Sequence, residues 1–295
     1  MIQQNKIIGH SDQINILKSN YKKNFPHAWI FNGIKGIGKY STAINFIKSV
    51  NKKKLNHEQY LFEINLDDNL ALIEDVRNII NQAHLTNANK NEKCFILIDN
   101  SDSLNFNSYN ALLKTIEEPP ENTVLIIICH NLNKIPKTIQ SRCIRLDFKP
   151  LSKTQINEFC LNNKIVTNEF DLEKNYNFFN GSIQKFLLFA SEEGKFIKKY
   201  LIDLNKKNRL SITEFEKFYE QVSGNYDKYF EIIINYVFAF QKRKYIKHSK
   251  NKLLLKKILF FFSNIEVLTK QDLNIEKKKE LFFLLSEYIK TNTNE

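Results

Sequence analysis

Apolar residues follow two different spacings along this chain, and the change between them divides it. From about residue 28 to residue 148, short apolar runs alternate with segments in which apolar residues recur every three or four positions. The short runs predict buried strands, and the longer spacing predicts amphipathic helices. The expected strands are Ala28–Asn32, Leu61–Asn65, Cys94–Ile98, Thr123–Cys129 and Cys143–Phe148.

Helices are expected between these strands. The predicted helices are Lys39–Val50, Ala71–Leu85 and Phe106–Glu118. Pro119 and Pro120 stop the last of them, because the residue before a proline is disfavoured in a helix. Strands that alternate with helices predict an α/β fold, in which a parallel sheet carries helices on both faces. The run Thr123–Cys129 is nearly all β-branched residues and leucine, which is typical of a strand buried on both faces.

The pattern becomes wholly helical after Lys149-Pro150-Leu151-Ser152. Pro150 restricts the residue before it, and Ser152 is a good N-cap for a following helix. Beyond about residue 192 the chain has no proline and keeps the helical spacing of apolar residues. We therefore expect three parts: an α/β domain over 1–150, a small helical unit over 151–192 and a larger helical domain over 193–295.

The chain is basic, with a formal net charge of +12 over 295 residues. Two interpretations stay open. A strongly positive protein favours a polyanionic partner such as nucleic acid. However, lysine and asparagine are abundant along the whole chain, and this pattern is equally typical of a proteome-wide bias in composition. The hydrophobic content of 42% predicts a packed core and excludes a disordered chain.

The four cysteines, Cys94, Cys129, Cys143 and Cys160, do not have the close pairing of a zinc site. Most lie in or beside apolar runs, so we expect reduced, buried thiols and a reducing compartment. The longest apolar runs are far shorter than the roughly twenty residues that cross a membrane. The first residues, Met1–Lys6, do not resemble a signal peptide. These features predict a soluble, cytoplasmic protein.

A candidate phosphate-binding loop follows the first expected strand. It reads Gly33-Ile34-Lys35-Gly36-Ile37-Gly38-Lys39-Tyr40-Ser41. In such loops the glycines let backbone N–H groups approach phosphate, and the lysine reaches the outer phosphates. Gly33, Gly36, Gly38 and Lys39 meet these needs. The alternative is an ordinary glycine turn with a surface lysine.

Other groups that hydrolysis requires are missing or displaced. Tyr40 stands where a small hydroxyl should bind magnesium, and Ser41 lies one helical position further on. Asp99, at the end of Cys94–Ile98, is the expected acidic partner, although a polar strand end explains it equally simply. The next residue, Asn100, is neutral and cannot act as a base. Asp102 is two residues further and too displaced to replace it confidently. The sequence thus predicts an ATP site that does not hydrolyse.

Two further motifs resemble the bacterial clamp-loader family, a group of AAA+ ATPases. They are the block Asn110–Pro120, which reads NALLKTIEEPP, and the triplet Ser141-Arg142-Cys143. The segment Ile73–Arg77 is similar to the same family, and the resemblance is dense from Ala28 to Phe148. It implies an AAA+ domain, a helical lid over 151–192 and a helical collar over 193–295 that joins subunits of a hetero-oligomer.

The resemblance also implies a role for Arg142. In that family the arginine of the triplet is a finger that enters a neighbouring subunit's ATP site, where its planar guanidinium faces phosphate charge. Without the flanking block, a simple surface arginine would be the preferred interpretation. The implied partners are motor and delta-like subunits, the sliding clamp and, through the complex, primed DNA. The implied function is to help load the clamp.

Two departures from the family change the expected cofactors. The stretch Gly181-Ser182-Ile183-Gln184 lacks the arginine that active members often carry there. No cysteine lies between Lys39 and Lys93, so the zinc module of many members is not expected. No cofactor is expected to be required, and ATP or ADP bound without turnover stays open. The rival functions are an active ATPase that recruits Ser41 to magnesium, and a basic DNA-binding accessory protein.

Overall fold

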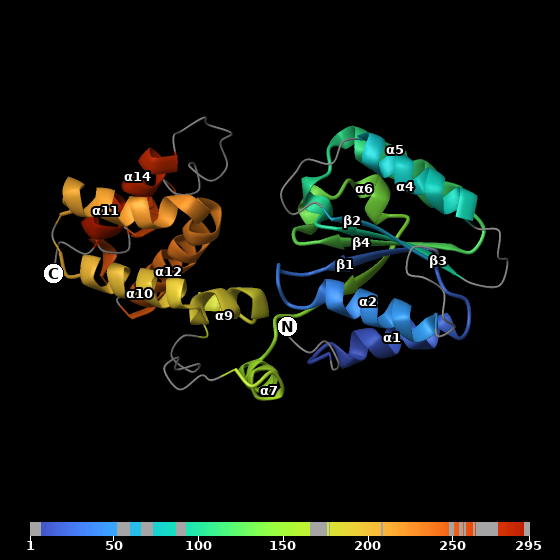
Figure 1. Ribbon diagram of the computed structural model, residues 1–295, viewed down its shortest axis with the longest axis horizontal. Helices are drawn as coiled ribbons and strands as arrows, with labels where there is room; N and C mark the ends of the chain where they lie inside the picture. The colour runs from blue at the N-terminus through green and yellow to red at the C-terminus, as the bar shows by residue number, and fades with distance from the viewer. Residues whose placement is uncertain are drawn as a thin grey trace. The chain divides into compact units, whose positions relative to one another are not determined.

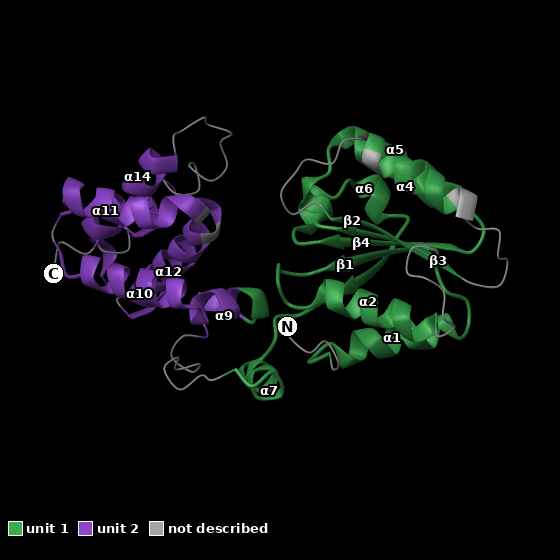
Figure 2. Cartoon of the chain, in the orientation of Figure 1, with its two compact units in different colours: residues 1–166, 181–184 green, residues 167–180, 185–295 purple. Residues whose placement is uncertain are grey.

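The computed structural model divides the chain into two compact units (Figure 2). Unit 1 comprises Met1–Val166 and Gly181–Gln184, and unit 2 comprises Thr167–Asn180 and Lys185–Glu295. The residues that the structure describes are 7–51, 60–65, 73–86, 93–165, 176, 178–207, 209–247, 251–253, 256, 258–261, 263 and 277–291. The expectation about Met1–Lys6 lies outside them. The three-part division at residues 150 and 192 stays a prediction.

Unit 1 is built on a five-stranded parallel sheet with the strand order β2-β3-β4-β1-β5 (Figure 1). Its strands are β1 (Ala28–Asn32), β2 (Leu61–Asn65), β3 (Cys94–Asp99), β4 (Thr123–Cys129) and β5 (Ile144–Asp147). All five predicted strands are confirmed. The seven residues of β4 are all buried, as its composition predicted for a strand covered on both faces.

Helices cover both faces of the sheet (Figure 1). One face carries α1 (Ser11–Tyr21) and α2 (Lys39–Val50), and the other carries α4 (Ile73–Thr86), α5 (Phe106–Glu117) and α6 (Lys137–Gln140). Neighbouring strand residues alternate between two apolar cores. Phe31 packs with Phe46 in the core under α1 and α2, and Ile30 packs with Leu112 in the core under α4 and α5. The predicted α/β fold is therefore confirmed.

Local signals set the helix boundaries. Asn105 caps α5 by accepting a hydrogen bond from the Ser108 N–H, and α5 ends just before the two prolines. Ser152 and Gln155 form a reciprocal capping box at the start of α7 (Lys153–Asn162), as the sequence predicted for Ser152. Short 3₁₀ turns occur at η1 (Ser101–Ser103), η2 (Leu132–Lys134) and η3 (Ser223–Asn225).

The described part of unit 2 is helical. Its helices are α9 (Ile183–Ala190, which begins in unit 1), α10 (Glu192–Leu204), α11 (Ile212–Val222), α12 (Tyr226–Lys247) and α14 (Lys277–Lys290). The predicted helix Leu253–Phe262 is helical where it is described, and Phe262 lies outside the described residues. The core of this unit buries aromatic side chains such as Phe218, Phe261 and Tyr288. The helical pattern after residue 192 is thus confirmed.

All four cysteines are buried free thiols. Burial raises the pKa of Cys94, Cys129 and Cys143 to about 12, so these thiols stay protonated at neutral pH. Within the described residues, none of the helices combines the length and the apolar character that crossing a membrane requires.

Candidate functional site

The candidate phosphate loop lies where a parallel sheet offers such a site, between the carboxyl end of β1 and the start of α2. Gly36 and Gly38 have φ angles of 78° and 101°, a left-handed backbone that glycine adopts without strain. A Cβ atom on Gly36 would also lie 2.5 Å from the Ser182 Oγ. Glycine is therefore required at this position by the neighbouring chain as well as by the turn.

Lys39 folds back over this loop. Its Nζ donates hydrogen bonds to the carbonyl oxygens of Gly33, at 2.5 Å, and of Ile34, at 2.8 Å, and only 3% of the residue is exposed. Burial lowers the pKa of Lys39 to about 8, and the nearby carboxylates of Asp99 and Asp102 oppose that shift. The ammonium is thus held in place and is mostly charged at neutral pH. This arrangement suits a phosphate group.

Tyr40 does not supply a metal ligand in the usual way. Its hydroxyl donates to the Glu63 carboxylate on β2 at 2.8 Å. Burial, together with this hydrogen bond, raises the pKa of Tyr40 to about 12, so the side chain remains a neutral phenol. Ser41 is exposed one position further along α2. The residues present therefore fit a phosphate but do not fit the magnesium ion of an ATPase.

The end of β3 brings Asp99 close enough to Lys39 for its carboxylate to favour the charged ammonium. The next residue differs in backbone as well as in side chain. Asn100 has a φ of 59° and a ψ of 50°, and its Nδ2 donates to the Ser103 Oγ at 3.2 Å. A left-handed residue sends its side chain in a different direction from an extended one.

The Asp102 carboxylate binds backbone N–H groups elsewhere in the fold. Its two carboxylate oxygens accept hydrogen bonds from the N–H groups of His130 and Asn131, at 3.1–3.3 Å. These bonds tie the 3₁₀ turn η1 to the chain that leaves β4. Asp102 therefore has a structural role in the fold. It does not replace the base that is missing from the position after Asp99.

Two contacts of the loop region, and one buried histidine near it, were not found by sequence reasoning. The Gln184 N–H donates to the Gly36 carbonyl at 3.2 Å, and the His10 Nε2 lies 2.7 Å from the Ile37 carbonyl oxygen. His130 follows β4, and its buried Nδ1 has no hydrogen-bond partner among the described residues. Burial and the charge of Lys39 lower the pKa of His130 to about 4. Of Gln184, His10 and His130, only Gln184 had been named from the sequence, because the stretch Gly181–Gln184 lacks the arginine that active family members often carry.

Arg142 lies on an exposed turn after α6, and it has no contact with the phosphate loop among the described residues. Its Nε lies 2.9 Å from the Glu117 Oε1, and its Nη1 donates to the Thr138 carbonyl at 3.1 Å. The side chain is 42% exposed. A guanidinium in this position is accessible to a second molecule, and the structure keeps it apart from Lys39 and Asp99.

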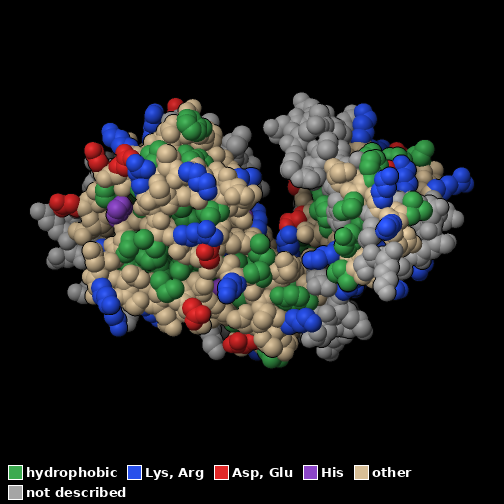
Figure 3. Space-filling model, turned by 180° about the vertical axis from the view of Figure 1, so that it is seen from behind, with side chains coloured by type: hydrophobic (Ala, Val, Ile, Leu, Met, Phe, Trp, Pro, Cys, Tyr) green, Lys and Arg blue, Asp and Glu red, His purple; other side chains and the backbone are tan. Residues whose placement is uncertain are grey.

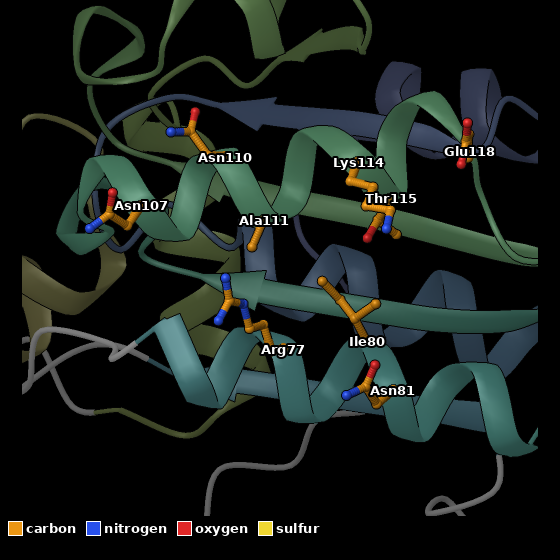
Figure 4. Close-up of a pocket in the computed structure, with 9 residues that line it drawn as sticks. All are labelled: Arg77, Ile80, Asn81, Asn107, Asn110, Ala111, Lys114, Thr115 and Glu118. Carbon is orange, nitrogen blue, oxygen red and sulfur yellow. The ribbon is translucent and has the colours of Figure 1, made fainter.

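A separate groove of about 640 Å³ lies between α4 and α5 (Figure 4). Arg77 and Lys114 contribute cationic groups to its lining, and asparagine side chains contribute amides. No residue of its lining belongs to the phosphate loop or to the end of β3, so the groove is not part of the candidate nucleotide site. The sequence pattern did not predict it.

The charged side chains do not mark a binding surface in this view. In the view of Figure 3, lysines and arginines are scattered among acidic, apolar and neutral residues rather than gathered in one patch. The described lysines and arginines therefore do not form a single basic patch on this face.

Comparisons with known proteins match this chain to subunits of DNA polymerase III. Residues 54–152 match the family model described as DNA polymerase III, delta subunit. The gamma subunit of DNA polymerase III from Buchnera aphidicola, of the Acyrthosiphon pisum strain, is 31% identical over 54% of this chain and 49% of its own length. The chain is related to AAA+ clamp-loader subunits. The matched range includes β3, the Asn110–Pro120 block and Arg142.

Further relatives of this clamp-loader class agree. The tau subunit of DNA polymerase III from Bacillus subtilis is 33% identical over 46% of this chain and 27% of its own length. The chain spans at most about half the length of the first curated relatives it matches. A DNA polymerase III, gamma subunit-related protein from Thermotoga maritima has a similar fold, with a TM-score of 0.54 and 18% identity, covering 96% of this chain and all of that one. This likeness shows that the two chains share their fold.

Proposed function

We propose that this chain is a delta-prime-like subunit of the DNA polymerase III clamp loader, which helps to load the sliding clamp onto primed DNA during replication. In this proposal Arg142 is an arginine finger that enters the ATP site of an adjacent motor subunit. The family model and the relatives support the proposal, because they are described as delta, gamma and tau subunits of that polymerase.

One combination of observations carries the proposal. The chain's own site keeps a buried lysine at its phosphate loop, yet its tyrosine hydroxyl is bonded to Glu63 and a left-handed asparagine follows Asp99. The arginine of the Ser-Arg-Cys triplet, by contrast, is exposed on a turn. A protein that lacks its own catalytic base and presents an arginine outward is suited to assist a neighbour's hydrolysis.

The proposed state of the chain's own site is binding without turnover. Gly33, Gly36, Gly38 and Lys39 would hold the phosphates of ATP or ADP, because glycine backbone and an ammonium are the groups that such phosphates require. Asp99, whose carboxylate acts on the charge of Lys39, would lie beside these phosphates. When bound, the nucleotide would supply only its anionic phosphates, since no residue here replaces the missing base. No zinc is part of this proposal.

The proposed partners are motor and delta-like subunits, with which unit 2 would form a hetero-oligomer in the cytoplasm. The helices α11 and α14 border a groove of about 730 Å³ whose lining includes Phe215, Phe282 and Phe283. Phe283 is partly exposed there. Apolar surface of this kind supports a role in assembly, although most of the aromatic residues of unit 2 fill its core.

Two other functions have some support. An active ATPase is favoured by the intact glycines and by the position of Lys39. A basic DNA-binding accessory protein is favoured by the net charge. The first predicts ATP turnover by the pure chain, and the second predicts DNA affinity without partners.

Co-purification tests the proposal most directly. The chain would be co-expressed with gamma-type and delta-type subunits, and the eluted complex would be assayed for loading of the sliding clamp onto primed DNA. We expect one stable complex whose loading activity depends on this chain. Separate elution of the chain, at concentrations where the other subunits associate, would overturn the assignment.

A further inference from the structure

The contacts of Arg142 single out Glu117. The Glu117 carboxylate is the acidic group within bonding distance of the guanidinium in the described part of the chain, with 2.9 Å between Nε and Oε1. Glu117 is the last residue of α5 and lies in the NALLKTIEEPP block. Two motifs that are separate in the sequence therefore meet in one ion pair.

The backbone around Arg142 is already fixed by other contacts. The Arg142 N–H donates to the Ile139 carbonyl at 3.1 Å, and the side chains of Ile139 and Cys143 on either side are buried. The Gln140 Nε2 donates to the carbonyl oxygens of Leu132 and Ile135. The main freedom left to Arg142 is therefore the rotamer of its own long side chain, which is costly to order.

The ion pair restricts that freedom on one edge of the guanidinium. A guanidinium has five N–H donors in one plane. Nε is bonded to Glu117, and Nη1 is bonded to the Thr138 carbonyl and lies 3.5 Å from the Ser141 Oγ. In the described part of the chain, Nη2 has no hydrogen-bond partner. Nε and Nη1 are therefore bonded within the chain, and the N–H groups of Nη2 are open.

We propose that Glu117 is a positioning residue, which holds Arg142 by its Nε so that Nη2 faces the phosphate of a neighbouring subunit's nucleotide. This inference rests on the proposed function of Arg142. It gives the final glutamate of α5 a role that acts through Arg142. Glu118, the next residue, is also exposed and has no contact with Arg142, so it provides a matched control.

The expected effect is modest, because both partners are about half exposed, at 42% and 51%. Exposed ion pairs contribute little free energy. Glu117→Ala should therefore lower the clamp- and DNA-stimulated ATP turnover of the complex about two- to fivefold. Glu117→Gln keeps an acceptor oxygen but loses the charge, and it should lie between wild type and Glu117→Ala. Glu118→Ala should match wild type.

The experiment compares complexes reconstituted with wild-type chain, Glu117→Ala, Glu117→Gln, Glu118→Ala, Arg142→Ala and the double variant Glu117→Ala/Arg142→Ala. If Glu117 acts through Arg142, the double variant has the turnover of Arg142→Ala alone, and the effect of Glu117→Ala shrinks as salt concentration rises. A purely structural role of Glu117 would instead lower turnover further in the Arg142→Ala background.

Different results would overturn the finger role of Arg142 and the positioning role of Glu117. If Arg142→Ala has wild-type turnover in a fully assembled complex, the finger itself is wrong. If Arg142→Ala lowers turnover but Glu117→Ala does not, or raises it, only the positioning role of Glu117 is overturned. Equal losses for Glu117→Ala and Glu118→Ala would also overturn it, because the control carboxylate does not contact Arg142.

Discussion

The Tyr40 hydroxyl donates a hydrogen bond to the Glu63 Oε2 at 2.8 Å, so α2 and β2 are linked beside the phosphate loop. This bond gives Tyr40 a structural use. It also commits the side chain that stands in the place of the small hydroxyl of an active phosphate loop. Together with Asn100, it explains why the candidate site is expected to lack hydrolysis.

The isolated chain should not turn over ATP. Phosphate release by the pure protein should stay at the level of a Lys39→Ala control over hours. Tyr40→Thr alone should not restore turnover, because Asn100 still supplies no base. Steady phosphate release by the wild-type chain that Lys39→Ala abolishes would contradict this prediction and would support the active-ATPase alternative.

Lysine should not replace Arg142. A lysine ammonium is a single charge and cannot bond Glu117 while presenting further N–H groups outward in a fixed plane. Arginine fingers contribute on the order of 10³–10⁵ in rate at one site. A complex with several ATP sites should lose less than this in total, since only one site faces this chain.

The measurement is ATP turnover and clamp loading by complexes that contain wild type, Arg142→Lys or Arg142→Ala, after equal assembly has been shown by gel filtration. Arg142→Lys should resemble Arg142→Ala rather than wild type. Full activity of Arg142→Lys would mean that positive charge alone is sufficient, and the forked geometry would then have no role.

His130 should make folding sensitive to mild acid. Its folded-state pKa is lowered to about 4, mainly by burial and then by Lys39, while Asp102 opposes the shift. The unfolded chain takes up a proton below about pH 6.5, and the folded chain does so only near pH 4. Stability should therefore fall as pH decreases through this window and change little with His130 outside it.

The test compares wild type with His130→Asn. Between pH 6.5 and pH 4, the free energy of unfolding of wild type should fall by about 1–3 kcal/mol more than that of the variant. Carboxylates that titrate in the same window affect both proteins and cancel in the comparison. Parallel pH profiles of the two proteins would show that His130 carries no such penalty.

The helices of unit 2 should be needed for assembly and not for the sheet of unit 1. A chain that ends at Gln184 keeps every strand and both segments of unit 1. It should retain cooperative thermal unfolding by circular dichroism, yet fail to co-elute with the other loader subunits. Normal co-elution of this shortened chain would place the assembly surface in residues 1–184 instead.

The strands and helices of unit 1 were predictable because each leaves a local signal. The run Thr123–Cys129 is too apolar to be anything but buried, and α5 ends where Pro119 and Pro120 require. The helical character of the chain after residue 192 was also predictable from spacing. These signals concern neighbours in the sequence, which is why they could be read without the fold.

The contacts of the site could not be predicted in the same way. Glu117 pairs with Arg142, and Gln184 bonds to Gly36, across parts of the chain that only the fold brings together. Nothing in the residue types specifies those partners. Lys39 and Asp99 could be assigned to one site because the carboxyl ends of parallel strands share an edge of the sheet. The roles of Arg142 and of the phosphate loop in catalysis stay predictions.

The left-handed backbone at Asn100 limits which residues can replace it during evolution. Asparagine tolerates this conformation, whereas most other residues, glutamate included, would be strained by roughly 1–2 kcal/mol. A mutation that restored glutamate after Asp99 would thus meet a backbone cost and would point the new carboxylate in the wrong direction. Regaining a catalytic base would require the turn Asn100–Ser103 to be rebuilt as well. Within the proposed function, glutamate at position 100 alone would therefore not be enough to give this chain ATP hydrolysis of its own.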